Sequence, residues 1–359
     1  MPKVLIDLRM VRGALHGIAR YALELARRLP LLEPTWDFSG LTGPDGLPGD
    51  LLELTPRIPL IKCGADFLSP FEQPVLAASL SKIQPDLFHA TSFSVPALWR
   101  GTLVATIHDA NHLELADGGG GVRGAYYRFV VAPRARRAEA LITVSNFSRE
   151  QISRHLKISP YRLQVIPNGV DALFHSALPG ELADFRSRRG LPQKYFAAIG
   201  SLKPHKNLKL FVAIAEEFPA KLVLLAGRGV RRALNFPESV IELSPLSDPE
   251  LALFYAGALA VLVPSRYEGF GLPALEAMAC GAPVIASDAG AHREILGKAG
   301  LLLSPDEPAA WKEACLRIFR DEALRQELID AGKERSARYT WDDCTQQTLE
   351  VYRRAIGRS

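Results

Sequence analysis

Two carboxylates flank a glycine-rich turn between Glu268 and Glu276, eight positions apart. A helix is predicted to begin near Pro273, because proline is favoured in the first turn of a helix. The free N–H groups at such a terminus bind anions, and Gly269 and Gly271 would let a ligand approach the backbone closely. This combination suits a ligand with both hydroxyls and phosphates, such as a nucleotide sugar. The alternative is a tight turn with two solvated glutamates.

The same turn also matches the dinucleotide fingerprint G-x-G-x-x-A over residues 269–274, with Asp288 at a tolerable distance. The match is weak, since the fingerprint usually opens its domain and this one follows several predicted strands. Glu268 would also place a negative charge beside a pyrophosphate. NAD binding is therefore the disfavoured alternative.

A second turn, at residues 199–208, places basic residues at the end of a predicted strand. Gly200 would allow close approach of a ligand, and Lys203 and Lys206 flank the turn. Lys206 precedes a predicted helix, where a cation opposes the helix dipole, so its position needs another reason. Binding a diphosphate is one such reason. A basic surface turn is the plain alternative.

Predicted strands alternate with predicted helices in both halves of the chain. The strands are expected at 3–8, 86–90, 103–107, 140–144, 195–199, 222–226, 240–243, 260–263, 283–286 and 301–303. The alternation predicts an α/β protein with two doubly wound, Rossmann-like domains facing a cleft, because ligands bind at the carboxyl ends of parallel strands. We expect the domains at 1–180 and 190–340, a linker near 177–193, and a final helix at 341–359 that crosses back to the first domain.

Composition excludes several classes of protein. The 359 residues include 43 Lys and Arg against 39 Asp and Glu, and this net charge of +4 is too small to require nucleic acid. No apolar stretch approaches the ~20 residues that cross a bilayer, and no signal peptide is predicted. The cysteines are far apart without a CxxC, which argues against structural zinc and disulfides and favours a reduced cytosol. They are Cys63, Cys280, Cys315 and Cys344.

Together the two turns resemble the retaining nucleotide-sugar glycosyltransferases of family four, which have the GT-B architecture of two facing Rossmann-like domains. Residues 200–207 resemble the phosphate-binding turn of that family, and residues 268–276 match its Glu-x7-Glu signature. Four further segments agree with the family in order: 16–21, 106–109, 144–148 and 165–171. The resemblance therefore covers most of the chain.

The resemblance implies roles for the matching residues in the second half. Lys206 would bind the donor diphosphate and stabilise the leaving group, with Gly200 and Ser201 in the same turn. Glu276 would hold the ribose hydroxyls, and Glu268 would contact the donor sugar as a catalytic residue. The backbone of three residues would contact sugar or phosphate: Phe270, Gly271 and Leu272.

In the first half, the resemblance implies that Gly17 lets a loop close on the diphosphate. His108 would be catalytic, near the anomeric carbon and the acceptor; the alternative is a satisfied core histidine. Two positions depart from the family pattern, because Ser201 and His205 stand where many members have arginine. Lys203 or backbone donors would then replace one phosphate-binding cation.

The chemistry that the resemblance implies needs a stabilised diphosphate leaving group. The chain has no Asp-x-Asp for a divalent metal, and Lys206 with helix N–H groups could act instead, so no metal or other cofactor is expected. The turn at residues 201–207 resembles those of bacterial polysaccharide enzymes. We therefore expect a retaining transferase that moves mannose from GDP-mannose to a saccharide or lipid-linked acceptor. A sugar-nucleotide epimerase and a non-catalytic sugar-nucleotide-binding subunit stay open as alternatives.

Residues 122–137 interleave basic and aromatic side chains. The arginines are Arg123, Arg128, Arg134, Arg136 and Arg137. One interpretation is a helix that docks on anionic lipid, where a lipid-linked acceptor would be presented. The other is a solvated helix face, and no motif supports nucleic-acid binding. The expected location is cytoplasmic, at most peripheral on the inner face of the membrane.

Overall fold

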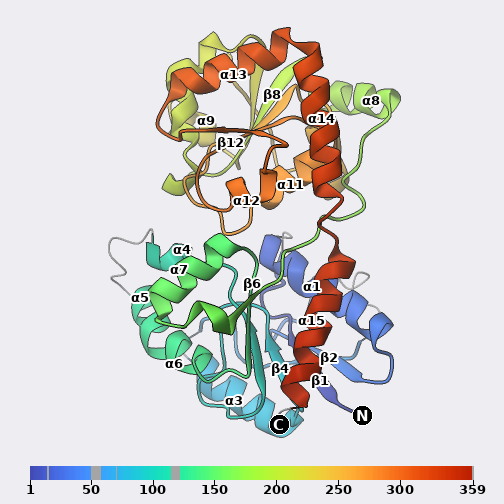
Figure 1. Cartoon of the computed structure of the whole chain (residues 1–359), viewed down its shortest axis with the longest axis vertical. Coiled ribbons are helices and arrows are strands. Elements are labelled where there is room, and N and C mark those ends of the chain that lie inside the picture. Colours follow the sequence, from blue (N-terminus) through green and yellow to red (C-terminus); the bar gives the residue numbers. More distant parts are fainter. Residues whose placement is uncertain (14–15, 50–57, 70, 115–121, 358–359) are drawn as a thin grey trace. The chain divides into compact units, whose positions relative to one another are not determined.

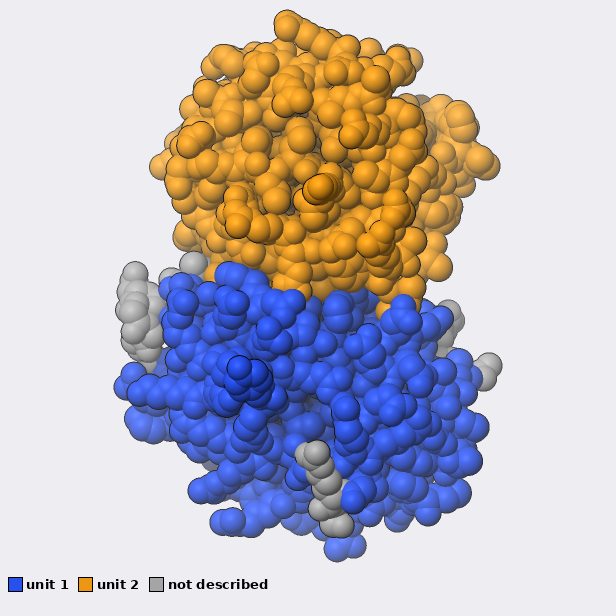
Figure 2. Space-filling view, in the orientation of Figure 1, with its two compact units in different colours: residues 1–169, 341–359 blue, residues 170–340 orange. Residues whose placement is uncertain are grey.

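The computed structural model describes residues 1–13, 16–49, 58–69, 71–114 and 122–357. Contacts between Cα atoms divide the chain into two compact units, which Figure 2 distinguishes by colour. Unit 1 comprises Met1–Gly169 and Trp341–Ser359, and unit 2 comprises Val170–Thr340. Each unit contains one parallel sheet between helices, so the prediction of two Rossmann-like α/β domains is confirmed.

The predicted linker at 177–193 is wrong, because helix α8 (Pro179–Arg189) occupies it and lies in unit 2. The glycine, proline and charges in this stretch are the signals of a helix rather than of a linker. Pro179 starts the helix, and the Glu181 carboxylate accepts a hydrogen bond from the Leu178 amide at 2.8 Å. Gly190 ends the helix with a left-handed φ of +62°.

The sheet of unit 1 has seven parallel strands in the order β3-β2-β1-β4-β5-β6-β7. Four of them were predicted: β1 (Lys3–Asp7), β4 (Leu87–Ala90), β5 (Leu103–Thr106) and β6 (Ala140–Thr143). The sequence analysis missed three: β2 (Asp37–Thr42), β3 (Leu60–Lys62) and β7 (Leu163–Val165). In β2 the apolar pattern is broken by Gly40, where an added Cβ would lie 2.6 Å from the Leu8 side chain. Gly40 therefore obscures the strand pattern in the sequence, but it is also the residue that lets β2 pack against Leu8.

Helices cover both faces of this sheet. On one face, α1 (Gly17–Leu32) and α15 (Trp341–Ile356) share a core with Val4 and Ile6 of β1. On the other, α3 (Glu72–Ile83) and α7 (Asn146–Leu156) pack with Leu5. The alternation along β1 is that of a strand buried on both faces. Shorter elements complete the unit: α4 (Asn111–Glu114), α5 (Val122–Tyr126), the π-helical turn η2 (Tyr127–Val131), α6 (Ala132–Ala135) and η3 (Pro160–Arg162).

A buried hydrogen-bond chain ties α15 to the sheet of unit 1. The Tyr352 hydroxyl lies 2.5 Å from Nδ1 of His89, whose Nε2 lies 2.8 Å from the Thr106 hydroxyl. The Thr106 hydroxyl is in turn 2.8 Å from the Tyr21 hydroxyl on α1. The final helix is thus joined to β4, β5 and α1 by polar contacts as well as by its apolar face.

The sheet of unit 2 has six parallel strands in the order β10-β9-β8-β11-β12-β13. All six were predicted: β8 (Tyr195–Ile199), β9 (Lys221–Leu225), β10 (Ile241–Glu242), β11 (Ala260–Val263), β12 (Val284–Ser287) and β13 (Leu301–Leu303). The strand order reverses between β8 and β11, which makes their carboxyl ends a switch point where ligands bind in such sheets. Both motif-bearing turns follow these two strands.

The helices of unit 2 surround this sheet (Figure 1). They are η4 (Pro204–Lys206), η5 (Leu208–Glu217), α8, α9 (Val230–Ala233), α10 (Asp248–Ala256), α11 (Leu272–Ala279), α12 (His292–Leu296), α13 (Pro308–Arg320) and α14 (Glu322–Ser336). A helix follows Asn207 as expected, but it is a 3₁₀ helix of ten residues, η5, rather than an α-helix. Asn207 itself has a left-handed φ of +53°, so the chain turns sharply before η5 begins.

Candidate active site

The turn after β8 and the loop after β11 meet through side chains. Nζ of Lys206 lies 2.7 Å from Oε1 of Glu268. The amide of Asn207 fixes the turn, donating to the carbonyl oxygens of Pro264 at 3.2 Å and Pro305 at 2.9 Å. The two motifs found separately in the sequence therefore form one site in unit 2.

The backbone of Glu268 is held by the loop between β12 and α12. The Ala291 amide donates to the Glu268 carbonyl at 3.0 Å. At Gly290, which has a φ of +61°, an added Cβ would lie 2.6 Å from the Glu268 nitrogen. Only glycine fits this close approach, so Gly290 packs against the backbone from which the Glu268 side chain extends.

Burial and Lys206 act in opposite directions on the ionisation of Glu268. Burial alone would raise the pKa of its carboxyl, but the charge and the hydrogen bond of Lys206 outweigh that effect and lower the pKa below its usual value. Glu268 is therefore ionised at neutral pH. Its charge offsets that of Lys206, and a diphosphate would compete with Glu268 for the ammonium group.

Helix α11 begins at Leu272, at the end of the loop that carries Glu268. Gly271 caps the helix with a left-handed φ of +99°, and Pro273 follows in the first turn. The backbone of Phe270 and Leu272 lies at the positive end of the helix dipole, which favours an anion. An added Cβ at Gly271 would lie 3.3 Å from the His292 ring, so glycine is required here too.

His292 is a site residue that the sequence analysis missed. Its Nδ1 lies 3.0 Å from the Ser287 carbonyl, which assigns the proton to Nδ1. Its Nε2 is buried and has no hydrogen-bond partner within the described part of the chain. Burial lowers the pKa of His292, so the ring is neutral and Nε2 can accept a hydrogen bond from a ligand. The available signal was its place just after β12, at the same edge of the sheet.

Glu276 lies on α11, one turn after the start of the helix, and its side chain is buried. The hydroxyl of Tyr255, on α10, donates to Oε2 of Glu276 at 3.3 Å. A carboxylate has acceptor capacity for several donors, so a pair of adjacent sugar hydroxyls can bind beside Tyr255. Tyr255 is the second site residue that the sequence analysis missed.

Gly200 and Ser201 shape the turn after β8. An added Cβ at Gly200 would lie 2.8 Å from the Leu208 side chain, so packing against Leu208 requires this glycine. The Ser201 hydroxyl accepts a hydrogen bond from the Lys203 amide at 3.4 Å. Both residues therefore have structural roles in the turn that presents Lys206.

His108 lies in unit 1, two residues beyond the end of β5, and is 9% exposed. Its Nε2–H donates to the Thr91 carbonyl at 2.9 Å, and its ring meets Tyr21 edge-on at 4.9 Å. Burial lowers the pKa of His108 to about 4, the Thr91 carbonyl acts against this effect, and His16 adds to it. The ring is neutral at pH 7, with Nδ1 as the hydrogen-bond acceptor.

Gly17 is the first residue of helix α1 and is exposed. His16 caps the helix, since its Nδ1 accepts a hydrogen bond from the Ala19 amide at 3.4 Å. Residues 14 and 15 of the predicted glycine loop lie outside the described residues. The start of α1 follows β1 and His108 follows β5, so both lie at the carboxyl ends of strands in one parallel sheet.

Two models of protein families match the chain. The model described as Glycosyltransferase Family 4 matches residues 15–172, and that described as Glycosyl transferases group 1 matches residues 181–335. The chain is a glycosyltransferase whose first half is a family 4 domain and whose second half is a group 1 domain. It is an enzyme that transfers a hexose.

This glycosyltransferase is 28% identical to O-antigen chain mannosyltransferase B of Escherichia coli, over 98% of the chain and 99% of the relative. It is 28% identical to O-antigen chain mannosyltransferase RfbU of Salmonella typhimurium, over 71% of the chain and 70% of that relative. A solved structure of HepE from Anabaena, in complex with UDP and glucose, matches with a TM-score of 0.79 at 20% identity, covering 98% and 99% of the two chains. This likeness shows the GT-B fold.

The arginine-rich segment of the glycosyltransferase is one continuous helical stretch over residues 122–135, in which the π-helical turn η2 joins α5 to α6. The prediction that Arg134 belongs to an exposed basic face is wrong. Arg134 is 9% exposed and donates to the carbonyls of Pro96, Arg137 and Gly101, so it supports the fold. Burial and neighbouring arginines lower its pKa to about 10. Arg136 is exposed but donates to the Leu156 carbonyl at 2.6 Å.

Two arginines of that segment, Arg128 and Arg137, are exposed, as is Phe129 at 72%. The side chain of Arg123 lies outside the described residues. None of the helices described in the glycosyltransferase has both the length and the apolar character to span a bilayer. Within the described ranges, no three His, Cys, Asp or Glu side chains gather as metal ligands would.

Proposed function

We propose that this glycosyltransferase moves mannose from GDP-mannose to a saccharide or lipid-linked saccharide acceptor in bacterial polysaccharide assembly. Two mannosyltransferases that extend O-antigen chains support this choice, one of them aligned along nearly the whole of both chains. The Anabaena structure with UDP and glucose supports a nucleotide-sugar donor. The acceptor class and the donor base rest on these relatives, whereas the reaction rests on the site in unit 2.

The ion pair of Lys206 and Glu268 beside the N-terminus of α11 carries the proposal. When the donor binds, its diphosphate takes the ammonium of Lys206, and the Glu268 carboxylate turns to hydroxyls of the donor sugar. As the bond to the anomeric carbon breaks, negative charge grows on the diphosphate. Lys206 and the amides at the start of α11 stabilise that charge. Electrostatic stabilisation of this kind is usually the largest single contribution to catalysis.

The same groups support transfer without a metal. Lys206 supplies a full positive charge and α11 about half of one, both next to the expected leaving group. Glu276, steadied by Tyr255, binds the ribose hydroxyls, and Nε2 of His292 accepts a hydrogen bond from the donor. In unit 1, Nδ1 of the neutral His108 accepts one from a sugar hydroxyl.

We propose that transfer retains the configuration of the anomeric carbon. The acceptor attacks from the face that the diphosphate leaves, and its proton passes to the departing diphosphate. This route requires no carboxylate as a nucleophile on the opposite face. Glu268 is unsuited to that role, because it lies beside Lys206 and therefore on the side of the expected leaving group rather than on the opposite face.

The test is turnover of GDP-mannose in EDTA with a mannoside acceptor, followed by release of GDP and by NMR of the product. The expected product is an α-linked mannoside, and Lys206→Ala abolishes turnover while exposed Lys209→Ala preserves it. A β-linked product would refute retention. Conversion of the donor to an epimer without acceptor would indicate the epimerase, and binding of GDP without turnover would indicate a non-catalytic subunit.

We also propose that the enzyme works in the cytoplasm, peripheral to the inner face of the membrane, docking through the exposed Arg128, Phe129 and Arg137. Each basic residue adds roughly 1 kcal/mol of attraction to an anionic surface. The double variant Arg128→Glu, Arg137→Glu should lose binding to phosphatidylglycerol vesicles. A matched double variant on unit 2, Arg188→Glu and Arg320→Glu, should bind like the wild type. Equal binding by all three proteins would contradict docking through this segment.

A further inference from the structure

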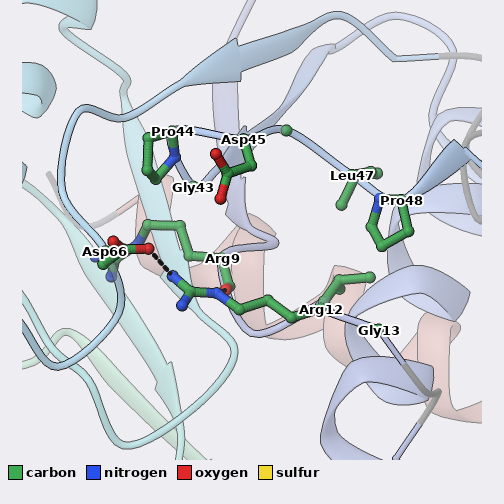
Figure 3. A pocket seen from close by; sticks show the side chains of 11 residues that line it. Arg9, Arg12, Gly13, Gly43, Pro44, Asp45, Leu47, Pro48 and Asp66 are labelled. Carbon is green, nitrogen blue, oxygen red and sulfur yellow. Dashed lines mark hydrogen bonds and ion pairs between the residues drawn. The ribbon is translucent and has the colours of Figure 1, made fainter.

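Unit 1 contains a pocket of about 260 Å³ at the carboxyl ends of β1, β2 and β3 (Figure 3). It is lined by residues that follow these strands: Arg9–Gly13 in part, Gly43–Pro48 and Asp66. Pockets for drug-sized ligands occupy about 300–1,000 Å³, so this one has room for a single sugar ring rather than a nucleotide sugar. Nothing in the proposed reaction uses it.

A tight turn forms one wall of the pocket. The Gly46 amide donates to the Gly43 carbonyl at 3.1 Å, with Pro44 and Asp45 between them. Proline at the second position and glycine at the fourth are typical of such a turn, and Gly46 has a left-handed φ of +83°. The turn projects the exposed carboxylate of Asp45, which Figure 3 shows facing the same space as Arg12 and Asp66.

The guanidinium of Arg12 is held in place although it is half exposed. Its Nε donates to the Arg9 carbonyl at 3.1 Å, and its Nη2 lies 2.9 Å from Oδ1 of Asp66. An added Cβ at Gly43 would lie 3.4 Å from the same Nη2, so glycine leaves space for the group. An oriented guanidinium beside two carboxylates can hydrogen-bond adjacent hydroxyls with little further loss of entropy.

Beneath the pocket, the charge of Arg9 is more than offset by two carboxylates. Its guanidinium is buried and lies 2.8 Å from the carboxylates of both Asp7 and Glu72. The charges that a ligand would meet are therefore one cation, Arg12, and two anions, Asp45 and Asp66. This balance disfavours a phosphate or a uronic acid. It suits a neutral ligand with many hydroxyls, whose C–H face can pack on Leu47 and Pro48.

We propose that this pocket binds a neutral hexose of the acceptor chain, a few sugars away from the hydroxyl that receives the new residue. His108 follows β5, which lies two strands from β1 and three from β2 in the sheet order. At ~4.8 Å per strand, that separation is about 10–14 Å. One sugar cannot span it, but a short oligosaccharide can. The inference rests on the proposed transfer reaction and adds acceptor length to its specificity.

The kinetic test compares methyl α-mannoside with linear mannobiose, mannotriose and mannotetraose as acceptors for GDP-mannose. For the wild type, kcat/KM should rise at least about tenfold from the shortest acceptor to the longest. In Arg12→Ala and Asp45→Ala this gain should fall below about threefold, with the KM for donor unchanged. Exposed Arg154→Ala, on α7, is the matched control and should keep the full gain. The same gain in all variants would overturn the proposal.

A binding test without donor separates this inference from the reaction. Saturation-transfer NMR measures binding of neutral tetrasaccharides of mannose, glucose and galactose, and of an oligomer of a hexuronic acid. We expect at least one neutral tetrasaccharide to bind the wild type and not Arg12→Ala. Absence of binding by all neutral probes, or preference for the acidic one, would overturn the pocket's assignment. Binding without any turnover would instead count against the proposed function.

Discussion

The ammonium nitrogen of Lys206 lies 2.7 Å from a carboxylate oxygen of Glu268, a residue 62 positions later in the chain. The pair joins the two turns at the switch point of the unit 2 sheet. It also means that a phosphate ligand must displace a carboxylate to reach the lysine. Glu268 is thus both a candidate sugar-binding group and an internal competitor of the diphosphate.

Glu268→Gln should separate these two roles. Removing the competing charge should let GDP bind at least as tightly as to the wild type. Turnover should fall by about 10²–10³-fold, the usual loss when one electrostatic contact to the reacting groups is removed. Calorimetry with GDP and steady-state kinetics measure the two effects. Weaker GDP binding in Glu268→Gln would show that the carboxylate does not compete for Lys206.

Glu276→Ala should reduce the preference of the site for GDP over an analogue that lacks the ribose hydroxyls. A hydrogen bond to a charged group contributes ~1.5–3 kcal/mol, so GDP affinity should fall by about 10–100-fold. The affinity for a dideoxyribose analogue of GDP should change little, because it lacks both hydroxyls. Tyr255→Phe should produce a smaller loss with the same selectivity. Equal losses for GDP and its analogue would place Glu276 away from the ribose.

Tyr352→Phe should loosen α15. The change leaves the buried His89 without its partner at Nδ1, and an unsatisfied buried group costs about 1–3 kcal/mol. Faster hydrogen exchange at the amides of α15 would report the loss. Tyr161 is 98% exposed, so Tyr161→Phe is a control that should leave exchange unchanged. Equal exchange rates in the two variants would show that the bond to His89 contributes no stability.

Acid should destabilise unit 1 through its buried histidines. Burial lowers the pKa of His89 to about 3 and that of His108 to about 4, against ~6.5 in an unfolded chain. Between these values the unfolded chain binds protons that the folded chain does not. The free energy of unfolding therefore decreases as the pH falls below about 6.5, by up to ~1.4 kcal/mol per pH unit for each histidine.

Urea denaturation from pH 7 to pH 4.5 would measure this slope. His108→Asn should reduce the slope of the unfolding free energy with pH by the contribution of about one histidine. Exposed His175→Asn should leave the slope unchanged. An unchanged slope in His108→Asn would mean that His108 is protonated as easily in the folded state as in the unfolded one.

The sheet of unit 2 was predictable because buried parallel strands are short, continuous apolar runs, of which Ala260–Val263 is an example. The two motifs were found for a similar reason, since each is contiguous in the sequence. Strand β2 was missed because Gly40 breaks its pattern, and the reason for that glycine is the Leu8 side chain above it. Such a reason lies in a tertiary contact and not in local sequence.

The site was only partly predictable for the same reason. Lys206 and Glu268 were both identified, but their pairing depends on the order of β8 and β11 in the sheet. His292 lacked a motif, and its importance comes from Gly271 and Glu268 packing around it. Arg134 looked like surface charge, because a count of arginines does not show that backbone carbonyls surround one of them.

The core of unit 1 includes Trp341, Leu349 and Tyr352, although the rest of that unit ends at residue 169. During synthesis, α1 must therefore wait for some 170 intervening residues of unit 2 before its partner helix is available. Unit 2 is continuous and can fold as it emerges from the ribosome, but unit 1 can be completed only at the end. Until then the apolar face of α1 is an exposed, aggregation-prone surface. A nascent chain stalled before residue 341 should consequently recruit chaperones to its N-terminal part.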